Sequence, residues 1–502
     1  MTKSVNKIVI LLVALLMCLA VVLAACKTAD FKPVDKPASA TPDSNGGIAV
    51  VYGDWLYYVN GYTSDVSAEN TYSNDVKDEP RIGSVVRIRL AEIEKILKIN
   101  DDSDLSSSEK TKKIASAVRG DVEGIQGAET VIPKIYYSGN TTTTQFTGIY
   151  IFNDRIYVTT PSDKLTPNGD PMTQQLVLMS FDLGGGDRKE HYTFTSNSAQ
   201  IWLATDKNGK LYATYLMDSI LHTLDVEAGK DTVVYREDDS NKKVSNTVSG
   251  VNWDVQNKLV FFLDKFGSIC KLEVGQTQYE VIVKNTDYKD HGDHIEAGKT
   301  TYTISFVNDG AVYYTVAQGK STDNVVMYWA KSSTEKDQTA LSTNSVSVNA
   351  WKGNKLIVTN SIKSGEKTYY SICIVEAVEG ENGKTDYKSK PILSYGDNDS
   401  SITINKVEGD KLYYTTGNIS YVIDLAVAEQ LGENEYLEGE ARAKSLAATT
   451  GWAAPDFVTV GNIHYIVSAA SGTVTLTKFD PSDLKATPVS IALTLTVAPA
   501  ED

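Results

Sequence analysis

Several polar segments of the sequence contain side chains that could bind a metal ion or transfer protons. The densest is residues 287–294, with the sequence Asp-Tyr-Lys-Asp-His-Gly-Asp-His, which holds two of the five histidines. Imidazole and carboxylate groups are common metal ligands, so His291, Asp293 and His294 are candidate ligands. The segment contains no cysteine and no pair of histidines four positions apart, and a solvated acidic loop is the competing interpretation.

The sequence contains none of the common nucleophile or phosphate-binding motifs. A Gly-x-Ser-x-Gly elbow is absent, as is a glycine-rich loop between a strand and a helix. The 64 acidic residues allow too many pairings to locate a carboxylate pair for sugar hydrolysis. We therefore expect a non-catalytic protein without a cofactor. An extracellular polysaccharide hydrolase or lyase is the alternative.

Three tryptophans are candidate ligand-binding residues. Trp202, Trp253 and Trp351 each lie in or near the first strand of a repeated unit. Indole rings displayed together can form a platform for sugar rings. Packing between neighbouring sheets is the competing interpretation.

A repeated unit must position these residues. In each copy a turn of Gly, Asn or Asp precedes an aliphatic residue and then aromatic or β-branched residues, as in residues 409–414, Gly-Asp-Lys-Leu-Tyr-Tyr. The aliphatic residue recurs at positions 56, 156, 211, 259, 312, 356, 412 and 463. After the first gap, the copies are 44 to 56 residues apart. An apolar run precedes each turn, so each copy predicts a β-hairpin.

A third strand, often with an acidic last residue, is expected after each hairpin. Candidates are residues 176–182, 220–225, 269–273, 419–424 and 474–480, and a fourth strand is expected at 232–235 and 279–283. Four antiparallel strands about every 50 residues predict an all-β fold, a β-propeller of four-stranded blades over residues 48–502. The eight copies favour eight blades. Seven blades, with one copy used for closure, is the alternative.

A short helical insertion is expected at residues 91–130, between the third and fourth strands of the first blade. Isoleucine and alanine recur with helical spacing over 91–97 and 106–118. Ser106 with Glu109 fits a capping box, and Gly120 stands where a C-terminal cap belongs.

The long connections are expected to emerge together on one face of the propeller. They comprise residues 61–81, 161–173, 287–300 and 361–367, whereas the turns between first and second strands are short. Long loops on a rigid scaffold often bind ligands, so this face is the expected binding face. Asp163 and Asp170, in the second of these loops, are further candidate ligand-binding residues. The competing interpretation is that each loop is an unconstrained insertion.

Cys270 and Cys373 are expected to remain unbridged and buried. They lie on the third strands of the fourth and sixth repeats, which a propeller separates by a whole blade. A disulfide requires Cα atoms within about 7 Å of each other, and this separation is greater.

Residues 1–25 are expected to form an export signal. Lys3 and Lys7 precede an unbroken apolar run. The run ends in Leu-Ala-Ala-Cys26, which resembles the lipobox of bacterial lipoproteins and implies lipidation of Cys26. The polar, proline-containing residues 26–47 are then a flexible linker. An uncleaved transmembrane anchor is the alternative.

The charge balance is acidic, with 48 basic and 64 acidic side chains and a net charge of −16. A nucleic-acid binder is excluded on this ground, because such proteins neutralise phosphates with Lys and Arg. The apolar content also argues against disorder, and four cysteines do not make a disulfide scaffold. Removal of residues 1–25 deletes two lysines and gives −16 − 2 = −18. A strongly acidic domain is expected to remain soluble and monomeric.

The hairpin at 409–414, followed by a strand that ends in an acid, resembles one propeller class. It is similar to the propeller domains of bacterial surface lipoproteins, a family of unknown function distantly similar to low-density-lipoprotein-receptor propellers. The resemblance covers residues 48–496 and implies a fold and an extracytoplasmic, membrane-anchored location, but no activity. The docking repeat of quinone-dependent propellers, Ala-x-Asp-x-x-Thr-Gly, is not visible. We expect a module that binds a protein, peptide or glycan; an envelope assembly or sensory subunit is a further alternative.

Overall fold

The structure is a computed structural model of the 502-residue chain. It describes residues 42, 47–61, 82–132, 148–161, 167–168, 175–195, 200–236, 247–254, 257–290, 295–308, 310–318, 327–334, 336–337, 348–351, 355–379, 385–394, 400–408, 410–417, 419–432, 435–437, 443–445, 457–461, 463–470, 472–480 and 489–496. The predicted signal segment and Cys26 lie outside these residues. Within them, no helix has the length and apolarity needed to span a membrane.

The first four sheets follow one another along the chain. Sheet 1 contains β1 (Ala49–Tyr52), β2 (Trp55–Val59), β3 (Val85–Arg89) and β4 (Glu129–Ile132). Sheet 2 contains β5 (Tyr150–Phe152), β6 (Arg155–Pro161), β7 (Leu176–Asp182) and β8 (Lys189–Thr193). Sheet 3 contains β9 (Gln200–Thr205), β10 (Leu211–Met217), β11 (Ile220–Asp225) and β12 (Lys230–Val233). Sheet 4 contains β14 (Ser249–Asp254), β15 (Leu259–Leu263), β16 (Ile269–Glu273), β17 (Gln278–Val283) and the short β13 (Tyr235–Arg236).

The remaining sheets repeat this order. Sheet 5 contains β20 (Thr300–Asn308), β21 (Ala311–Gln318), β22 (Met327–Ala330) and β23 (Lys336–Asp337). Sheet 6 contains β24 (Val348–Ala350), β25 (Lys355–Ser364), β26 (Lys367–Glu379) and β27 (Thr385–Pro391). Sheet 7 contains β28 (Ile402–Glu408), β29 (Lys411–Thr416), β30 (Ile419–Asp424) and β31 (Ala443–Ser445). Sheet 8 contains β32 (Phe457–Val460), β33 (Ile463–Ala470), β34 (Thr473–Phe479) and β35 (Val489–Ala492). A two-stranded ribbon, β18 (Tyr288–Asp290) and β19 (Ile295–Ala297), lies between sheets 4 and 5 in the chain.

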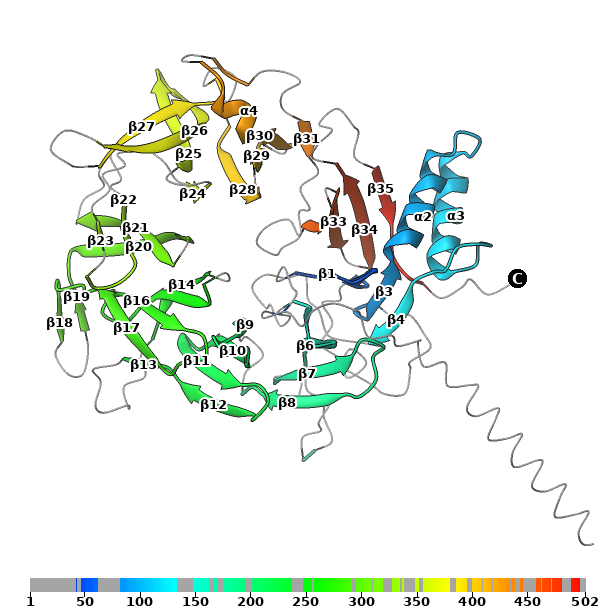
Figure 1. Ribbon diagram of the computed structural model, residues 1–502, viewed down its shortest axis with the longest axis horizontal. Helices are drawn as coiled ribbons and strands as arrows, with labels where there is room; N and C mark the ends of the chain where they lie inside the picture. The colour runs from blue at the N-terminus through cyan, green and yellow to red at the C-terminus, as the bar shows by residue number, and fades with distance from the viewer. Residues whose placement is uncertain are drawn as a thin grey trace, which may run out of the picture.

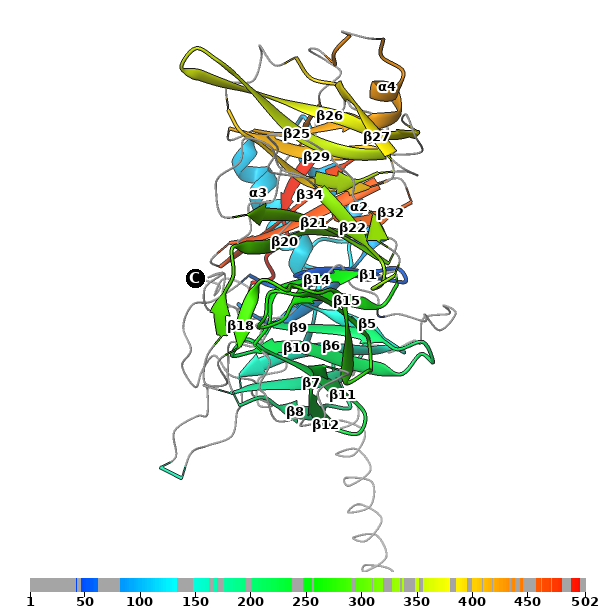
Figure 2. The ribbon, with the colours of Figure 1, turned by 90° about the vertical axis from the view of Figure 1, so that its left-hand side faces the viewer.

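The sheets are arranged in a ring (Figure 1). The view turned by 90° shows this ring from its side, with successive sheets next to one another (Figure 2). First strands of neighbouring sheets contact each other, as β14 does with β20, and β24 with β28. The strand β1 contacts β32, so the two ends of the described domain meet. The mostly-β, propeller-like fold expected from the sequence is therefore confirmed.

All eight predicted hairpins are present among the described strands, and the predicted third strands agree with β7, β11, β16, β30 and β34 to within one residue. Local chemistry explains the turns: in the β5–β6 turn Asn153 and Asp154 have φ of 48° and 57°. A two-residue turn with both φ values positive matches the twist of the flanking strands, and Asn and Asp tolerate this conformation best after Gly.

Three predicted boundaries differ from the structure. The prediction of one fourth strand at 232–235 is wrong, because this segment is divided between two strands. The strand β12 ends at Val233, and β13 pairs in parallel with β17 of the next sheet. The expected loop at 361–367 is also wrong, because β25 and β26 remain paired up to Ser364 and Lys367. Part of the expected loop at 287–300 is the ribbon β18–β19.

The helical insertion is confirmed between β3 and β4. It consists of α2 (Leu90–Asp101) and α3 (Ser107–Arg119). Ser106 and Glu109 form the predicted capping box, and Gly120 ends α3 with φ of 84°. The sequence analysis did not anticipate α4 (Leu425–Glu429), whose first N–H groups bond to the carboxylate of Asp424.

The insertion fastens sheet 1 to sheet 8. Both helices contact β35, and Glu94 of α2 accepts hydrogen bonds from Lys478 Nζ at 2.6 Å and from the hydroxyl of Tyr465 at 2.5 Å. Buried residues of sheets 1, 2 and 8 and of both helices form one continuous apolar cluster. Burial of this shared surface stabilises the contact between the ends of the ring.

The expectation for the cysteines is confirmed. Cys270 lies in β16 and Cys373 in β26, both are fully buried, and neither is in a disulfide.

Candidate functional site

Trp202 and Trp253 come together on the first strands of neighbouring sheets. Trp202 is in β9 and Trp253 is in β14, and their ring centroids are 4.8 Å apart with a 39° tilt. Trp202 is buried, with 8% of its surface exposed, whereas Trp253 is half-buried. Trp253 is therefore the more accessible residue of the pair, and Trp202 packs against it.

The strand β14 contains an irregularity before Trp253. The register of β14 with β15 shifts between Ser249 and Asn252, and the bulge contains Gly250 with φ of 59°. Ser249 and Gly250 are exposed, and the amide of Asn252 donates to the carbonyl of Gly250 at 2.9 Å. Bulges often redirect side chains at functional sites. Here the bulge leaves Ser249 and Gly250 exposed in the same strand that carries Trp253.

Trp351 does not join the other two tryptophans in a common surface. Its indole N–H donates to Asp410 Oδ1 in the β28–β29 turn at 3.2 Å, and its ring packs against the cluster shared by sheets 6 and 7. For this residue the competing interpretation, packing between sheets, is the one that the geometry supports.

The other candidate residues are not placed by the structure. Asp163, Asp170, His291, Asp293 and His294 lie outside the described residues. Within the described part of the chain, no group of three or more His, Cys, Asp or Glu side chains is arranged to hold a metal ion.

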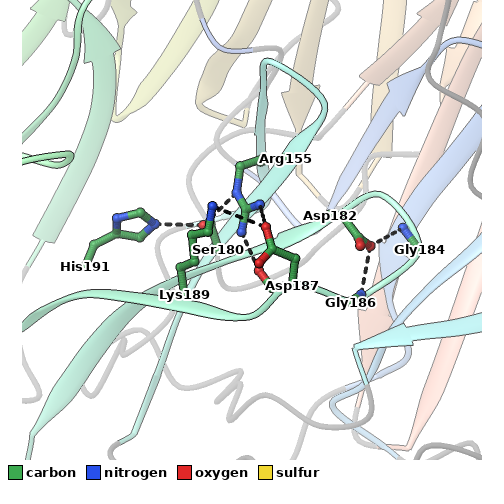
Figure 3. A network of polar contacts seen from close by, with 8 residues as sticks. All are labelled: Arg155, Ser180, Asp182, Gly184, Gly186, Asp187, Lys189 and His191. Atoms are coloured by element: carbon green, nitrogen blue, oxygen red, sulfur yellow. Dashed lines mark hydrogen bonds and ion pairs between the residues drawn. The ribbon is translucent and has the colours of Figure 1, made fainter.

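The sequence analysis missed a serine–histidine pair in sheet 2. Ser180 Oγ of β7 lies 2.7 Å from His191 Nε2 of β8, and Arg155 Nε donates to the same hydroxyl at 3.0 Å (Figure 3). His191 Nδ1 lies 3.2 Å from the carbonyl oxygen of Val226, beyond the end of β11 in sheet 3. A serine hydrogen-bonded to an oriented histidine is the arrangement expected of an activated nucleophile.

The directions of these hydrogen bonds identify the state of the imidazole. A carbonyl only accepts, so Nδ1 carries the proton, and Nε2 of a neutral ring then accepts from Ser180. Burial lowers the pKa of His191, the bond to Val226 opposes this, and the charges of Arg155 and Lys189 lower it further. The imidazole is therefore neutral near pH 7.

Comparison of the sheets favours a structural role for this pair. Ser180 is two residues before the end of the third strand of its sheet, the same place that Arg87 and Lys271 occupy in sheets 1 and 4. Arg87 Nη1 donates to Leu183 O at 3.0 Å, and Lys271 Nζ donates to Lys331 O at 2.8 Å.

Each of those acceptors is the first residue after the third strand of the following sheet, as Val226 is for His191. The Ser180–His191 pair thus makes the contact that a cation makes elsewhere in the ring. Ser180 is also fully buried, out of reach of a substrate.

The hairpin turns are joined in a similar way. In four pairs of neighbouring sheets, a residue at or just after the end of a first strand forms a hydrogen bond with the first turn of the next sheet. In two of them the strand-end residue donates: the hydroxyl of Tyr52 to Asp154 Oδ1, and the indole of Trp351 to Asp410 Oδ1. In the other two the turn donates: Lys258 Nζ to the carbonyl of Asp206, and Gly310 N to Asp254 Oδ2. The polar turn residues of the repeat therefore connect neighbouring sheets.

The acid that ends the third strand also has a role in packing. Lys411 Nζ bonds to Asp424 Oδ2 at 2.6 Å, and Lys210 Nζ bonds to Asp225 Oδ2 at 2.5 Å. In both sheets the lysine directly precedes the aliphatic residue of the repeat. In these two copies the repeated motif therefore forms an ion pair with the acid of the third strand.

Comparisons with known proteins give distant similarity only. No family model matches the sequence, and no curated protein matches it. Among solved structures, prolyl oligopeptidase B from Galerina marginata has a TM-score of 0.40 and 11% identity, covering 88% of this chain and 61% of that one. A prolyl endopeptidase has a TM-score of 0.38 and 14% identity, covering 70% of this chain and half of that one. A nidogen/laminin complex has a TM-score of 0.26 and 15% identity, covering 51% and 88% of the two chains. These are distant similarities to β-propeller domains.

Proposed function

We propose that this chain is a lipid-anchored, extracytoplasmic β-propeller that binds a glycan without catalysing a reaction on it. In this proposal Cys26 carries the lipid, residues 26–47 are the tether, and the eight sheets are eight blades. A peptide or protein ligand is the broader form of the same proposal. The fold alone does not determine function, so the argument rests on the site.

The observation that carries the proposal is the Trp202–Trp253 pair. Sugar rings present C–H faces that stack on indole, and hydroxyl groups that need polar partners. Trp253 is partly exposed, and the bulge earlier in β14 leaves Ser249 and Gly250 exposed on the same strand. A carbohydrate chain that follows β14 would contact both.

The polar contacts between sheets support a binding scaffold. Side chains that resemble catalytic groups, such as Ser180 with His191, instead join one sheet to the next. A rigid ring of this kind holds a recognition surface in a fixed geometry, which lowers the conformational entropy lost on binding.

The direct experiment uses the chain from residue 27 onward with purified wall and environmental polysaccharides and wall-derived peptides. We expect co-sedimentation with at least one polysaccharide and no release of reducing ends or unsaturated products. Product release would instead favour a hydrolase or lyase. Binding only to a protein from envelope extracts would favour an assembly or sensory subunit.

A further inference from the structure

Four polar side chains converge between sheets 2 and 3, apart from the tryptophan pair. Tyr215 of β10 and His222 of β11 are opposite each other in the ladder, and their rings stack at 4.6 Å with a 14° tilt. His222 Nδ1 lies 3.1 and 3.3 Å from the two carboxylate oxygens of Asp231 in β12. Tyr192 of β8 brings a second phenol, with its ring centroid 6.4 Å from that of Tyr215.

The hydroxyl of Tyr215 is buried in this cluster. The side chain is fully buried, and no hydrogen bond of good geometry reaches its oxygen. Burial first, and then the charge of Asp231 and the polar interactions with the side chains of Tyr192 and Asp231, raise the pKa of this phenol. A ligand that engages the oxygen would supply the well-directed contact that it lacks.

We propose that Tyr192, Tyr215, His222 and Asp231 form a ferric ion site. Two phenolates and one carboxylate carry three negative charges, which balance a trivalent cation, and the imidazole adds a neutral nitrogen. Three anionic oxygen donors suit a small, highly charged ion better than zinc, which prefers cysteine and histidine.

The spacing of the donors is compatible with coordination. Ligands at about 2.1 Å from an octahedral ion lie about 3 Å apart when they are adjacent. The separation of 3.1 Å between His222 Nδ1 and Asp231 Oδ2 meets this condition. Formation of the site requires loss of both phenolic protons as the ion binds, as for other metal sites with protonated ligands.

An ion can reach the cluster from the rim of the ring. The strands β8 and β12 are the last strands of their sheets, and Tyr192 and Asp231 are partly exposed. Fractional exposure of the side chains is 22% for Asp231 and 10% for His222. Solvent therefore reaches the carboxylate edge, where water or an anion would complete the coordination. This site does not depend on the glycan proposal, because it shares no residue with the tryptophan pair.

The test is titration of the mature chain with Fe(III) supplied as its nitrilotriacetate complex. Phenolate bound to Fe(III) gives a charge-transfer band in the visible region, which reports coordination by tyrosine directly. We expect the band to saturate at one ion per chain. Tyr192→Phe should weaken binding by about tenfold or more, as should His222→Gln, and Tyr192→Phe/Tyr215→Phe should abolish the band.

Tyr328→Phe is the matched control, because Tyr328 also stacks on a tyrosine, Tyr314, in sheet 5. It should titrate like the wild type. Far-UV circular dichroism would verify folding, and Tyr192→Phe, at a partly exposed position, decides the question if the double variant unfolds. No band in the wild type, or equal titration by Tyr192→Phe and Tyr328→Phe, would overturn the assignment.

Discussion

Asn60 and Leu495 exchange two hydrogen bonds across 435 positions of the chain. The side-chain amide of Asn60 donates to the carbonyl of Leu495 at 2.8 Å, and the Leu495 N–H donates to Asn60 Oδ1 at 2.9 Å. Next to them, the hydroxyl of Tyr58 donates to Leu493 O at 2.7 Å. Residues that follow β2 and β35 are thereby joined, which fixes the last sheet of the ring to the first.

Asn60→Ala should destabilise the whole domain. Asn60 is fully buried, so the substitution leaves the N–H and C=O of Leu495 without their partner. We expect a loss of about 3 kcal/mol in the free energy of unfolding, measured by urea denaturation. Asn208→Ala, in an exposed turn where Asn208 bonds only within the turn, is the control and should change the free energy little. Equal midpoints for the two variants would contradict ring closure through Asn60.

The burial of His191 should make stability depend on pH. Burial lowers the pKa of His191 below its unfolded value of about 6.5, so the unfolded chain binds the proton more readily. Stability is therefore complete above the unfolded pKa and falls as the pH drops towards the folded pKa. Thermal melts of wild type and His191→Gln from pH 8 to pH 5 should show a smaller loss in the variant. Parallel curves would indicate that His191 is not the group responsible.

Asp424 should contribute to stability in two separable ways. Its carboxylate bonds to Lys411 and accepts from the N–H groups of Ala426 and Val427. Asp424→Ala removes both contacts and should cost about 1–2 kcal/mol, whereas Asp424→Asn keeps a capping oxygen and should cost less.

The pH dependence at Asp424 provides a second check. Burial raises the pKa of this carboxyl, but the bonds from Lys411 and the backbone outweigh it and lower the pKa overall. The stabilisation that Asp424 provides is therefore complete above the unfolded pKa of about 4. It is lost as the pH falls from there through the lower folded pKa. Equal stability of the Ala and Asn variants would refute the capping role.

The two thiols of the folded domain should be unreactive. Cys270 and Cys373 are fully buried, and burial raises the pKa of the Cys270 thiol well above its ordinary value. Since thiolate is the reactive form, a thiol reagent should label neither residue in native protein and both in urea. Mass spectrometry of unreduced protein should show no link between them. Rapid labelling in native buffer would contradict the burial.

The sequence predicts the parts of this fold that depend on local chemistry. Turn residues, an aliphatic position and β-branched or aromatic neighbours specify each hairpin, and Ser106 with Gly120 specifies the limits of α3. Strand pairing between different repeats was less predictable. The strand β13 does not pair within sheet 3, because its partner strand, β17, lies in the next sheet.

The contacts between sheets could not be predicted, because their partners lie in different repeats. Nothing local distinguishes Trp351, which bonds to Asp410 of the next sheet, from Trp253, which pairs with Trp202. In the same way, the role of His191 depends on Val226 of the following sheet and on the position that Ser180 shares with Arg87.

The most direct test of the proposed function is the affinity of Trp253→Ala for the polysaccharide with which the mature chain co-sediments. Isothermal titration with fragments of that polysaccharide should show about tenfold weaker binding by Trp253→Ala, which is about 1.4 kcal/mol. Trp351→Phe, which removes the indole hydrogen bond between sheets 6 and 7, should bind like the wild type. Wild-type affinity in Trp253→Ala, with the fold intact, would contradict a glycan site at the Trp202–Trp253 pair.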